Sequence, residues 1–344
     1  MNAHPPTIRL FLLALGLCAV SARGDEAKKP DEAQMRGAIA KSLVFLDEQA
    51  DTWMNDRTCN ACHTMPELVW SHREAKRRGF AIDQEKFDEF VDWSVSRAKK
   101  AKGADEMTAF MKLAMPEGTT PELTKLIVDS QKPDGSWTLG GQFSNMQRRE
   151  APEASGNSLR LFLLALGTEK DPSAVDAARA KAAALLEKND PPKSVETLIF
   201  RALYAQRFGP PEAAVNLRAE VLKLQHPDGG WSFMVNETQS DSLATGQALY
   251  LLQQSPEASS AEAIARGQGW LVSQQREDGG WSIDITRISR LDRSGPTKVK
   301  SFKDATGIYT FWGSAWATLG LVQGFPVTNP QETKAPELAL PTTP

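Results

Sequence analysis

The sequence predicts an all-α protein built as a ring of about six helical hairpins, and three observations support this. A turn pattern, Q-x-x-D-G-x-W, occurs three times and ends at Trp137, Trp231 and Trp281. The last two of these tryptophans are 50 residues apart and the first two are 94 apart, which is two steps of 47. The segments between the turns carry apolar residues at helical spacing, and none shows the convincing alternation of a half-buried strand.

Each part of the turn pattern suits the end of a helix. Asp-Gly gives a sharp reversal, because glycine accepts positive φ where a helix stops. Tryptophan supplies a large flat anchor, and glutamine in the last helical turn can bond backbone groups of a neighbouring turn. The pattern therefore predicts a helix end followed by the start of the next helix.

The turn spacing divides the chain into hairpins. The first begins at Asp31, which forms a capping-box pattern with Gln34, and Gln49-Ala50-Asp51-Thr52-Trp53 resembles a decayed turn. The missing copy between the first two intact turns falls near Leu186-Glu187-Lys188-Asn189-Asp190. The hairpins are expected at 31–80, 84–118, 119–167, 173–208, 212–254 and 260–324. Such units bury their apolar faces only against neighbours, and six of them can close into a ring.

The N-terminus has the pattern of a secretory signal peptide over residues 1–22. An apolar run follows Arg9, is too short for a membrane span, and ends at the small-residue cleavage pattern Val20-Ser21-Ala22. Cys18 raises the alternative of a lipoprotein, but the bulky Leu17 stands where such sites have a small residue. We therefore expect a protein exported to the periplasm or secreted.

The chemistry-bearing motif is Cys59-Asn60-Ala61-Cys62-His63, which reads C-x-x-C-H, the attachment pattern of a c-type haem. Two thiols at this spacing add to the two vinyl groups of the porphyrin, and the adjacent imidazole of His63 ligates the iron. Cys59 and Cys62 are the only cysteines left once the signal is removed. The sequence thus predicts a covalent haem c, with Cys59 and Cys62 binding the cofactor and His63 as the proximal iron ligand.

Two other interpretations of the motif stay open. A redox disulfide of thioredoxin type would need a βαβ context, which the sequence lacks. A zinc site would need four ligands, and only His72 and His226 remain as soft candidates. Both histidines suit ordinary positions, His72 on a helix surface and His226 inside a repeat turn.

The sixth iron ligand is an open question. Met115, followed by Pro116, sits in a loop after a helical pattern and is the candidate from the far side of the haem. A five-coordinate iron would favour small-molecule chemistry instead. A helix is expected directly after the C-x-x-C-H motif. Thr64 and Glu67 resemble a capping box at its start, Pro66 lies in its first turn, and Gly79 lies at its end.

The turns resemble the QW motifs of terpenoid cyclases, squalene–hopene cyclase in particular. The fullest match is Arg266-Gly267-Gln268-Gly269-Trp270-Leu271-Val272-Ser273-Gln274-Gln275 running on to Trp281. The resemblance implies an α/α toroid with inner helices around a central cavity. It covers residues 119–324 well and 31–118 weakly, and it implies either an apolar ligand or, by analogy with toroidal lyases, a glycan in the cavity.

The activities of these families do not carry over with the fold. The chain has no D-x-D-D run to protonate a polyene and no D-D-x-x-D run for a diphosphate. It also has no cysteine in the toroid body for a prenyltransferase zinc and no C-G-E-Q thioester. The layout as a whole resembles exported bacterial proteins in which a C-x-x-C-H hairpin precedes squalene-cyclase-type repeats, with Arg78-Gly79-Phe80 closing the following helix.

Other side chains have both functional and structural interpretations. Glu153 and Asp241 fall at one repeat phase and are candidates for acid–base work at the cavity mouth, although helix starts favour carboxylates anyway. Trp312 and Trp316 are candidates for lining the cavity or for ordinary core packing. The basic segment from Ser94 to Lys102 is a candidate for docking an acidic redox partner, or a solvated helix face.

Four regions and two hypotheses of function follow. The regions are a signal peptide (1–22), N-terminal hairpins carrying the haem site (23–118), squalene cyclase-like repeats of the same toroid (119–324) and a disordered Pro-rich tail (325–344). The first hypothesis is an exported c-type haem protein for electron transfer or redox chemistry. The second is a terpenoid cyclase-like or polysaccharide lyase-like enzyme, or a non-catalytic binding module. The formal net charge of −3 argues against nucleic acid as a partner.

Overall fold

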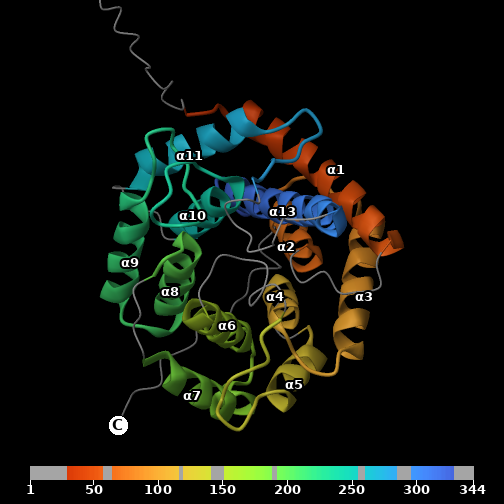
Figure 1. The fold of residues 1–344 in the computed structure, drawn as a ribbon, viewed down its shortest axis with the longest axis vertical. Helices are drawn as coiled ribbons and strands as arrows, with labels where there is room; N and C mark the ends of the chain where they lie inside the picture. Colours follow the sequence, from red (N-terminus) through yellow and green to blue (C-terminus); the bar gives the residue numbers. More distant parts are fainter. Residues whose placement is uncertain are drawn as a thin grey trace, which may run out of the picture.

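The computed structural model describes residues 29–56, 64–115, 119–140, 151–187, 192–254, 260–284 and 296–328. Within these ranges the chain forms twelve α-helices and no strand. Figure 1 shows two concentric layers of helices, with each outer helix followed by an inner one. The expected fold class, an α/α toroid of six hairpins, is confirmed.

The outer layer holds α1 (Glu32–Asp56), α3 (Gln84–Lys100), α5 (Pro121–Asp129), α7 (Asp176–Ala184), α9 (Pro211–Lys223) and α11 (Ala261–Gln274). The inner layer holds α2 (Met65–Arg77), α4 (Glu106–Ala114), α6 (Ala151–Leu166), α8 (Val195–Phe208), α10 (Ser242–Gln254) and α13 (Pro296–Val322). Short 3₁₀ turns, η2 (Pro172–Ala174) and η3 (Leu185–Glu187), flank α7. None of the helices in the described ranges is long and apolar enough to cross a membrane.

The inner helices run in the same direction. Hydrogen bonds between the beginnings of neighbouring inner helices, and between their ends, show this. The backbone amide of Ser194, directly before α8, donates to Glu153 in the first turn of α6 (3.0 Å). Arg207, late in α8, donates to the carbonyl oxygen of Gly167, which follows α6 (2.8 Å). We call the end where the inner helices begin the N-terminal mouth, and the end where they stop the C-terminal mouth.

The three Q-x-x-D-G-x-W turns have one geometry. In the middle copy, the side-chain amide of Gln225 donates to the Gly229 carbonyl oxygen within its own turn (2.8 Å) and to the Ala263 carbonyl oxygen of α11 (2.7 Å). Gly229 has φ 93°, and a Cβ there would lie 2.7 Å from the carbonyl oxygen of Arg266. Each turn therefore fastens one outer helix to the next, and glycine is required by conformation and by space.

The tryptophan of each turn fastens the turn to the helix that precedes it. The indole N–H donates to the carbonyl oxygen ten residues upstream, at 2.8 Å in all three copies: Trp137 to Ile127, Trp231 to Val221 and Trp281 to Leu271. All three rings are buried. The buried polar atom of each indole is thus satisfied, as a tryptophan in a core requires.

The last turn closes the ring onto the first helix. Gln275 donates to the Ala38 carbonyl oxygen of α1 (2.8 Å), in the way that the earlier turns bond the next outer helix. On the inner side, the hydroxyls of Ser42 in α1 and Thr318 in α13 lie 2.5 Å apart. Hairpin six therefore contacts hairpin one as a neighbour, and the array has no exposed end.

Two sequence expectations are wrong. Gln49-Ala50-Asp51-Thr52-Trp53 forms no turn, since it lies within α1, which continues to Asp56 because no glycine or proline interrupts it. The disordered tail does not begin at 325. Phe325 is buried against Phe80, with ring centroids 5.1 Å apart, and the Thr328 amide donates to the Arg77 carbonyl oxygen (2.9 Å). Burial of one aromatic ring offsets the cost of ordering these residues.

Candidate functional site

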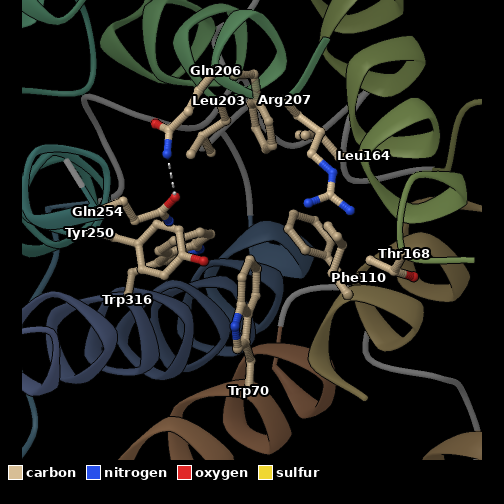
Figure 2. Close-up of a pocket in the computed structure, with 12 residues that line it drawn as sticks. Trp70, Phe110, Leu164, Thr168, Leu203, Gln206, Arg207, Tyr250, Gln254 and Trp316 are labelled. Carbon is tan, nitrogen blue, oxygen red and sulfur yellow. Dashed lines mark hydrogen bonds between the residues drawn. The ribbon is translucent and has the colours of Figure 1, made fainter. Parts of the chain in front are cut away.

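A pocket of about 290 Å³ lies on the axis of the ring, among the C-terminal halves of the inner helices. Figure 2 shows its walls. Residues from all six hairpins line it: Trp70, Phe110, Leu113, Leu164, Thr168, Phe200, Leu203, Gln206, Arg207, Tyr250, Gln254 and Trp316. A pocket that depends on every inner helix is the ligand-site candidate of this fold.

Aromatic rings form one wall of this pocket. Trp70, Tyr250 and Trp316 contact one another edge to face, with ring centroids 5.2–5.7 Å apart and interplanar angles of 62–77°. They come from α2, α10 and α13, so the cluster exists only when the ring is closed. Such a wall offers flat apolar faces for stacking.

Polar groups lie at the end of the pocket toward the C-terminal mouth, where they come from the last residues of α8 and α10 and from Thr168, which follows α6. Figure 2 shows the Arg207 guanidinium and the Tyr250 hydroxyl directed toward the centre, and Gln206 donating to Gln254 (3.4 Å). Burial, with a further contribution from the negative charge of Glu74, raises the pKa of Tyr250, so the phenol stays neutral and able to donate. The pocket therefore combines aromatic faces with several hydrogen-bonding groups at one end.

A layer of carboxyl groups lies toward the N-terminal mouth, about one helical turn from the aromatic wall. Glu67, Glu106, Glu153 and Glu196 occupy the first turns of α2, α4, α6 and α8, and all are buried. On α2, Glu67 precedes Trp70 by three residues, and on α8, Glu196 precedes Phe200 by four. The interior is thus acidic at one level and aromatic at the next.

The carboxyl of Glu67 has a strongly raised pKa. Burial raises the pKa of its carboxyl to about 8, and the negative charge of Glu196 raises it further, although the Glu67 backbone amide and the Trp312 indole lower it in part. Neither carboxyl oxygen meets hydrogen-bond geometry with a protein group. A carboxyl kept protonated in this way at neutral pH is the kind of group that serves acid chemistry.

The expected capping box of Thr64 and Glu67 does not form. Thr64 precedes α2 but makes no side-chain capping bond, and its hydroxyl is buried without a partner. The spacing T-x-x-E is the same for a cap and for an inward-facing acid, so the pattern alone could not separate them. The available signal for Glu67 was its position, since it lies between apolar residues, Met65 and Pro66 before it and Leu68 and Val69 after it.

The two acids that the sequence singled out have structural roles. Glu153 accepts hydrogen bonds from the backbone amides of Lys193 (2.8 Å) and Ser194 (3.0 Å), and so anchors the start of α8. Asp241 accepts from the amides of Phe233 (2.7 Å) and Ala244 (2.8 Å) and caps α10. The helix-start interpretation therefore accounts for both residues.

The two histidines also have structural partners. His72, expected on a surface, is buried instead, with its Nε2 2.9 Å from Asp47 and its Nδ1 3.0 Å from the Leu68 carbonyl oxygen. His226 lies 3.0 Å from the Ser240 hydroxyl, within its repeat turn. In the described ranges no group of three or more His, Cys, Asp or Glu side chains is placed to hold a metal ion.

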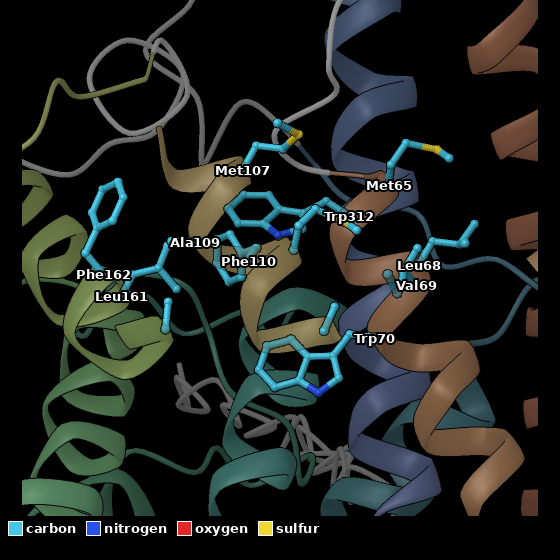
Figure 3. Close-up of a cluster of buried hydrophobic side chains, with 14 of the residues drawn as sticks. Met65, Leu68, Val69, Trp70, Met107, Ala109, Phe110, Leu161, Phe162 and Trp312 are labelled. Carbon is cyan, nitrogen blue, oxygen red and sulfur yellow. The ribbon is translucent and has the colours of Figure 1, made fainter. Parts of the chain in front are cut away.

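The predicted haem residues Cys59, Cys62 and His63 lie outside the described residues. Their chain position is informative, since they fall between the end of outer helix α1 and the start of inner helix α2. Figure 3 shows Met65, Met107 and Trp312 near this N-terminal end of the core. Met115 directly follows α4, at the C-terminal mouth, and is partly buried.

No protein-family model matches the sequence, and no curated protein matches it. Among solved structures, the chain is similar to an ent-copalyl diphosphate synthase from Streptomyces platensis, with 17% identity over 75% of this chain and a TM-score of 0.49. The chain spans about half (50%) of that synthase. It is also similar to a glycosidase in complex with glucose, with 11% identity over 86% of this chain and 100% of the glycosidase, and a TM-score of 0.52. Likeness at such identities concerns the fold, which is that of the α/α toroids.

Proposed function

We propose that the toroid is a ligand-binding body of the enzyme-like kind, and that its central pocket takes a small glycan. The observation that carries this is the composition of the pocket wall. Trp70, Tyr250 and Trp316 offer faces on which a sugar ring stacks, and Gln206, Gln254, Thr168 and Arg207 offer groups for its hydroxyls. A toroid of the same fold has been seen with glucose, which agrees with this ligand class.

An unfunctionalised prenyl chain is the contrasting ligand, since the aromatic wall alone would suit it. It could make no use of the amide, guanidinium and hydroxyl groups of the pocket, whereas the hydroxyls of a sugar can bond to these groups in addition to the partners that they already have. The polar end of the pocket therefore favours a ligand with several hydroxyl groups.

Intrinsic tryptophan fluorescence of the full chain tests this proposal, because two indoles line the pocket. We expect a neutral oligosaccharide panel to give saturable quenching and farnesol to give none. Gln254→Ala should weaken glycan binding by about tenfold, which corresponds to one lost hydrogen bond. Lys125→Gln, on the exposed face of α5, is the matched control. Binding of farnesol but of no glycan would contradict the glycan assignment.

A second function is proposed on a separate observation, the C-x-x-C-H motif in an exported chain. We propose that Cys59 and Cys62 carry a covalent haem c and that His63 ligates its iron. Two fully buried apolar side chains, Met65 and Met107, lie near the N-terminal mouth, where the chain leads from the motif into α2. Such apolar surroundings suit a porphyrin. The group would supply a one-electron redox centre, with an acidic protein as the electron partner.

A pyridine haemochrome spectrum and an intact mass of the exported protein test the haem proposal. We expect the mass of the chain without residues 1–22 plus one haem, and we expect Cys59→Ala/Cys62→Ala to remove it. Colourless protein from a host that matures cytochromes c would contradict the proposal. This outcome would leave the glycan proposal untouched, because the pocket lies at the other level of the ring.

The sixth iron ligand can be tested with two methionines. Met115 follows α4 at the C-terminal mouth, whereas Met107 lies in the first turn of the same helix, at the mouth where α2 begins. Because an α-helix rises about 1.5 Å per residue, the two methionines lie roughly the length of α4 apart. We therefore propose Met107 ahead of Met115 as the distal ligand. Met107→Leu should remove the iron–thioether absorption band, and Met115→Leu should retain it; the opposite result would return the role to Met115.

A further inference from the structure

The central pocket contains a fixed positive charge. Among the described residues that line it, Arg207 is the one that carries a charge. Its Nη2 donates to the carbonyl oxygen of Gly167 (2.8 Å), which holds the end of the side chain beside the end of α6. Figure 2 shows the guanidinium directed toward the centre of the pocket. A guanidinium is always charged in proteins and has five N–H donors, so it can serve several acceptors at once.

Other lining side chains offer hydrogen-bond donors to the same space. Trp316 is 1% exposed, and its indole N–H is buried without a hydrogen-bond partner. The side-chain oxygen of Gln254 accepts from Gln206 (3.4 Å), which leaves the amide N–H groups of Gln254 to donate. The Tyr250 hydroxyl is directed toward the centre and keeps its proton, because burial raises its pKa. Indole and amide N–H groups can only donate, so these side chains favour a ligand rich in acceptors.

The end of α2 adds positive charge at the same mouth. Arg73, Arg77 and Arg78 all pair with the carboxylate of Glu74, so three guanidinium groups surround a single negative charge. Arg73 also donates to the carbonyl oxygen of Ala114 (2.6 Å), the last residue of α4, which directly follows a residue that lines the pocket. Positive charge is in excess in this group. The apolar walls of the pocket lower the local dielectric constant, which strengthens the attraction of an anionic ligand.

We infer that the glycan of the central pocket carries a carboxylate, as a uronic acid does, and that Arg207 binds this carboxylate. The inference rests on the proposed glycan-binding function and narrows its ligand class. An ionised carboxylate accepts hydrogen bonds and donates none, so it suits the N–H and O–H groups that line this pocket. Its two oxygens also match two parallel N–H groups of a guanidinium. Neutral sugars bind as well, but more weakly, because a hydroxyl forms a weaker hydrogen bond with a guanidinium than a carboxylate does.

Matched ligands test the inference in the full chain. Uronic acid oligosaccharides of the gluco, galacto and manno series are each compared with the methyl ester, which keeps every hydroxyl group but has no charge. Quenching of tryptophan fluorescence reports binding, since Trp70 and Trp316 line the pocket. We expect at least one acid to bind about tenfold more tightly than its ester, as one charge-assisted hydrogen bond provides. Added salt should reduce this ratio.

Substitutions at the same mouth separate contact with the carboxylate from a structural role of Arg207. Arg207→Gln removes the charge and should bring the ratio of acid affinity to ester affinity close to one, whereas Arg207→Lys should retain part of it. Lys170→Gln removes an exposed positive charge near the same mouth and should leave the ratio unchanged. A variant that only loosens the fold would weaken the binding of acid and ester alike, and circular dichroism would detect it.

The outcomes distinguish this inference from the glycan proposal on which it rests. Binding of the ester as tight as that of the acid, or an unchanged ratio in Arg207→Gln, would overturn the carboxylate assignment. The glycan proposal would then stand, because the uncharged ester still binds. If no acid, ester or neutral oligosaccharide bound, the glycan proposal itself would be contradicted, and the carboxylate assignment with it.

Discussion

At the scale of single residues, two buried glutamates on one helix have opposite electrostatics. Glu74, near the end of α2, is surrounded by Arg73, Arg77 and Arg78; although burial alone would raise the pKa of its carboxyl, these guanidinium groups lower it to about 2. Glu67, near the start of α2, has a pKa raised to about 8 by burial, with a further contribution from the negative charge of Glu196. The neighbouring charges, and not the residue type, decide which state is present at neutral pH.

We expect the stability of the protein to fall as pH rises from about 4.5 to about 8 on account of Glu67. Its carboxyl binds a proton more tightly in the folded state, so the unfolded state loses its proton first and gains stability as pH rises. The shift corresponds to about 4–5 kcal/mol across that interval. Urea unfolding at several pH values measures it. Glu67→Gln should flatten the profile, and an equal slope in both proteins would contradict the raised pKa.

On account of Glu74, we expect the stability of the protein to rise with pH in the acidic range, opposite to the effect of Glu67. The stabilisation by Glu74 is present above about pH 4.5 and is lost as pH falls toward 2, because the folded state holds the carboxylate against protonation. We expect Glu74→Gln to cost about 3 kcal/mol or more at pH 7, since three guanidinium groups lose their anion. Thermal unfolding at pH 7 and pH 3 measures this, with Glu212→Gln, an exposed glutamate in the first turn of α9, as control. A loss of the same size at both pH values would argue against the charge explanation.

At the scale of helices, glycine sets how closely α10 and α13 pack. A Cβ on Gly246 would collide with the carbonyl oxygen of Trp316, and one on Gly320 would lie 2.8 Å from the carbonyl oxygen of Gly246. The backbones of α10 and α13 therefore lie closer together than any residue larger than glycine would allow at these two positions. This contact holds Trp316 and Tyr250 at the separation that forms the aromatic wall of the pocket.

Gly246→Ala should therefore destabilise the protein although alanine is the better helix former. We expect a loss of about 1–3 kcal/mol from overpacking, together with weaker ligand binding in the pocket. Gly37→Ala on α1 is the matched comparison, because no atom lies within 4 Å of its added methyl group. It should gain about 0.5–1 kcal/mol. Chemical denaturation of both variants gives the comparison, and a stabilised Gly246→Ala would show that the helices can separate.

At the scale of the whole molecule, closure of the ring links hairpin six to hairpin one. Gln275 makes the same two hydrogen bonds as the other turn glutamines, but its partner Ala38 is 237 residues away. An open array of repeats unfolds in parts, because each unit contacts only its neighbours. A closed ring gives every hairpin two neighbours.

We expect one cooperative transition when urea unfolding is followed both by far-ultraviolet circular dichroism and by tryptophan fluorescence. Gln275→Ala removes two hydrogen bonds at the closure, about 1–3 kcal/mol in total, and should lower both midpoints together. Gln131→Ala removes the equivalent pair inside the array and should have a similar effect. Midpoints that separate in Gln275→Ala alone would show that the ring opens at this seam before it unfolds.

The sequence by itself determined the architecture of this protein. Three turns at repeat spacing, each with a glycine, a glutamine and a tryptophan in fixed places, specify hairpins that bury their faces only against one another, and local chemistry is sufficient for that. It also supplied the C-x-x-C-H motif, whose chemistry depends on spacing along the chain and not on the fold. Positions on the helices were less readable: Gln49 to Trp53 resembled a turn, and Glu67 resembled a cap.

Only the tertiary structure decided what lies inside the ring. Whether a glutamate on an inner helix caps that helix or faces the axis depends on which atoms of the opposite helix surround it. Glu67 and Glu196 are 129 positions apart in the chain, and no local pattern records that the charge of Glu196 acts on Glu67. The same holds for Trp70, Tyr250 and Trp316, whose pocket exists only after closure. Burial and charge are properties of neighbours in space, and the ring brings those neighbours together.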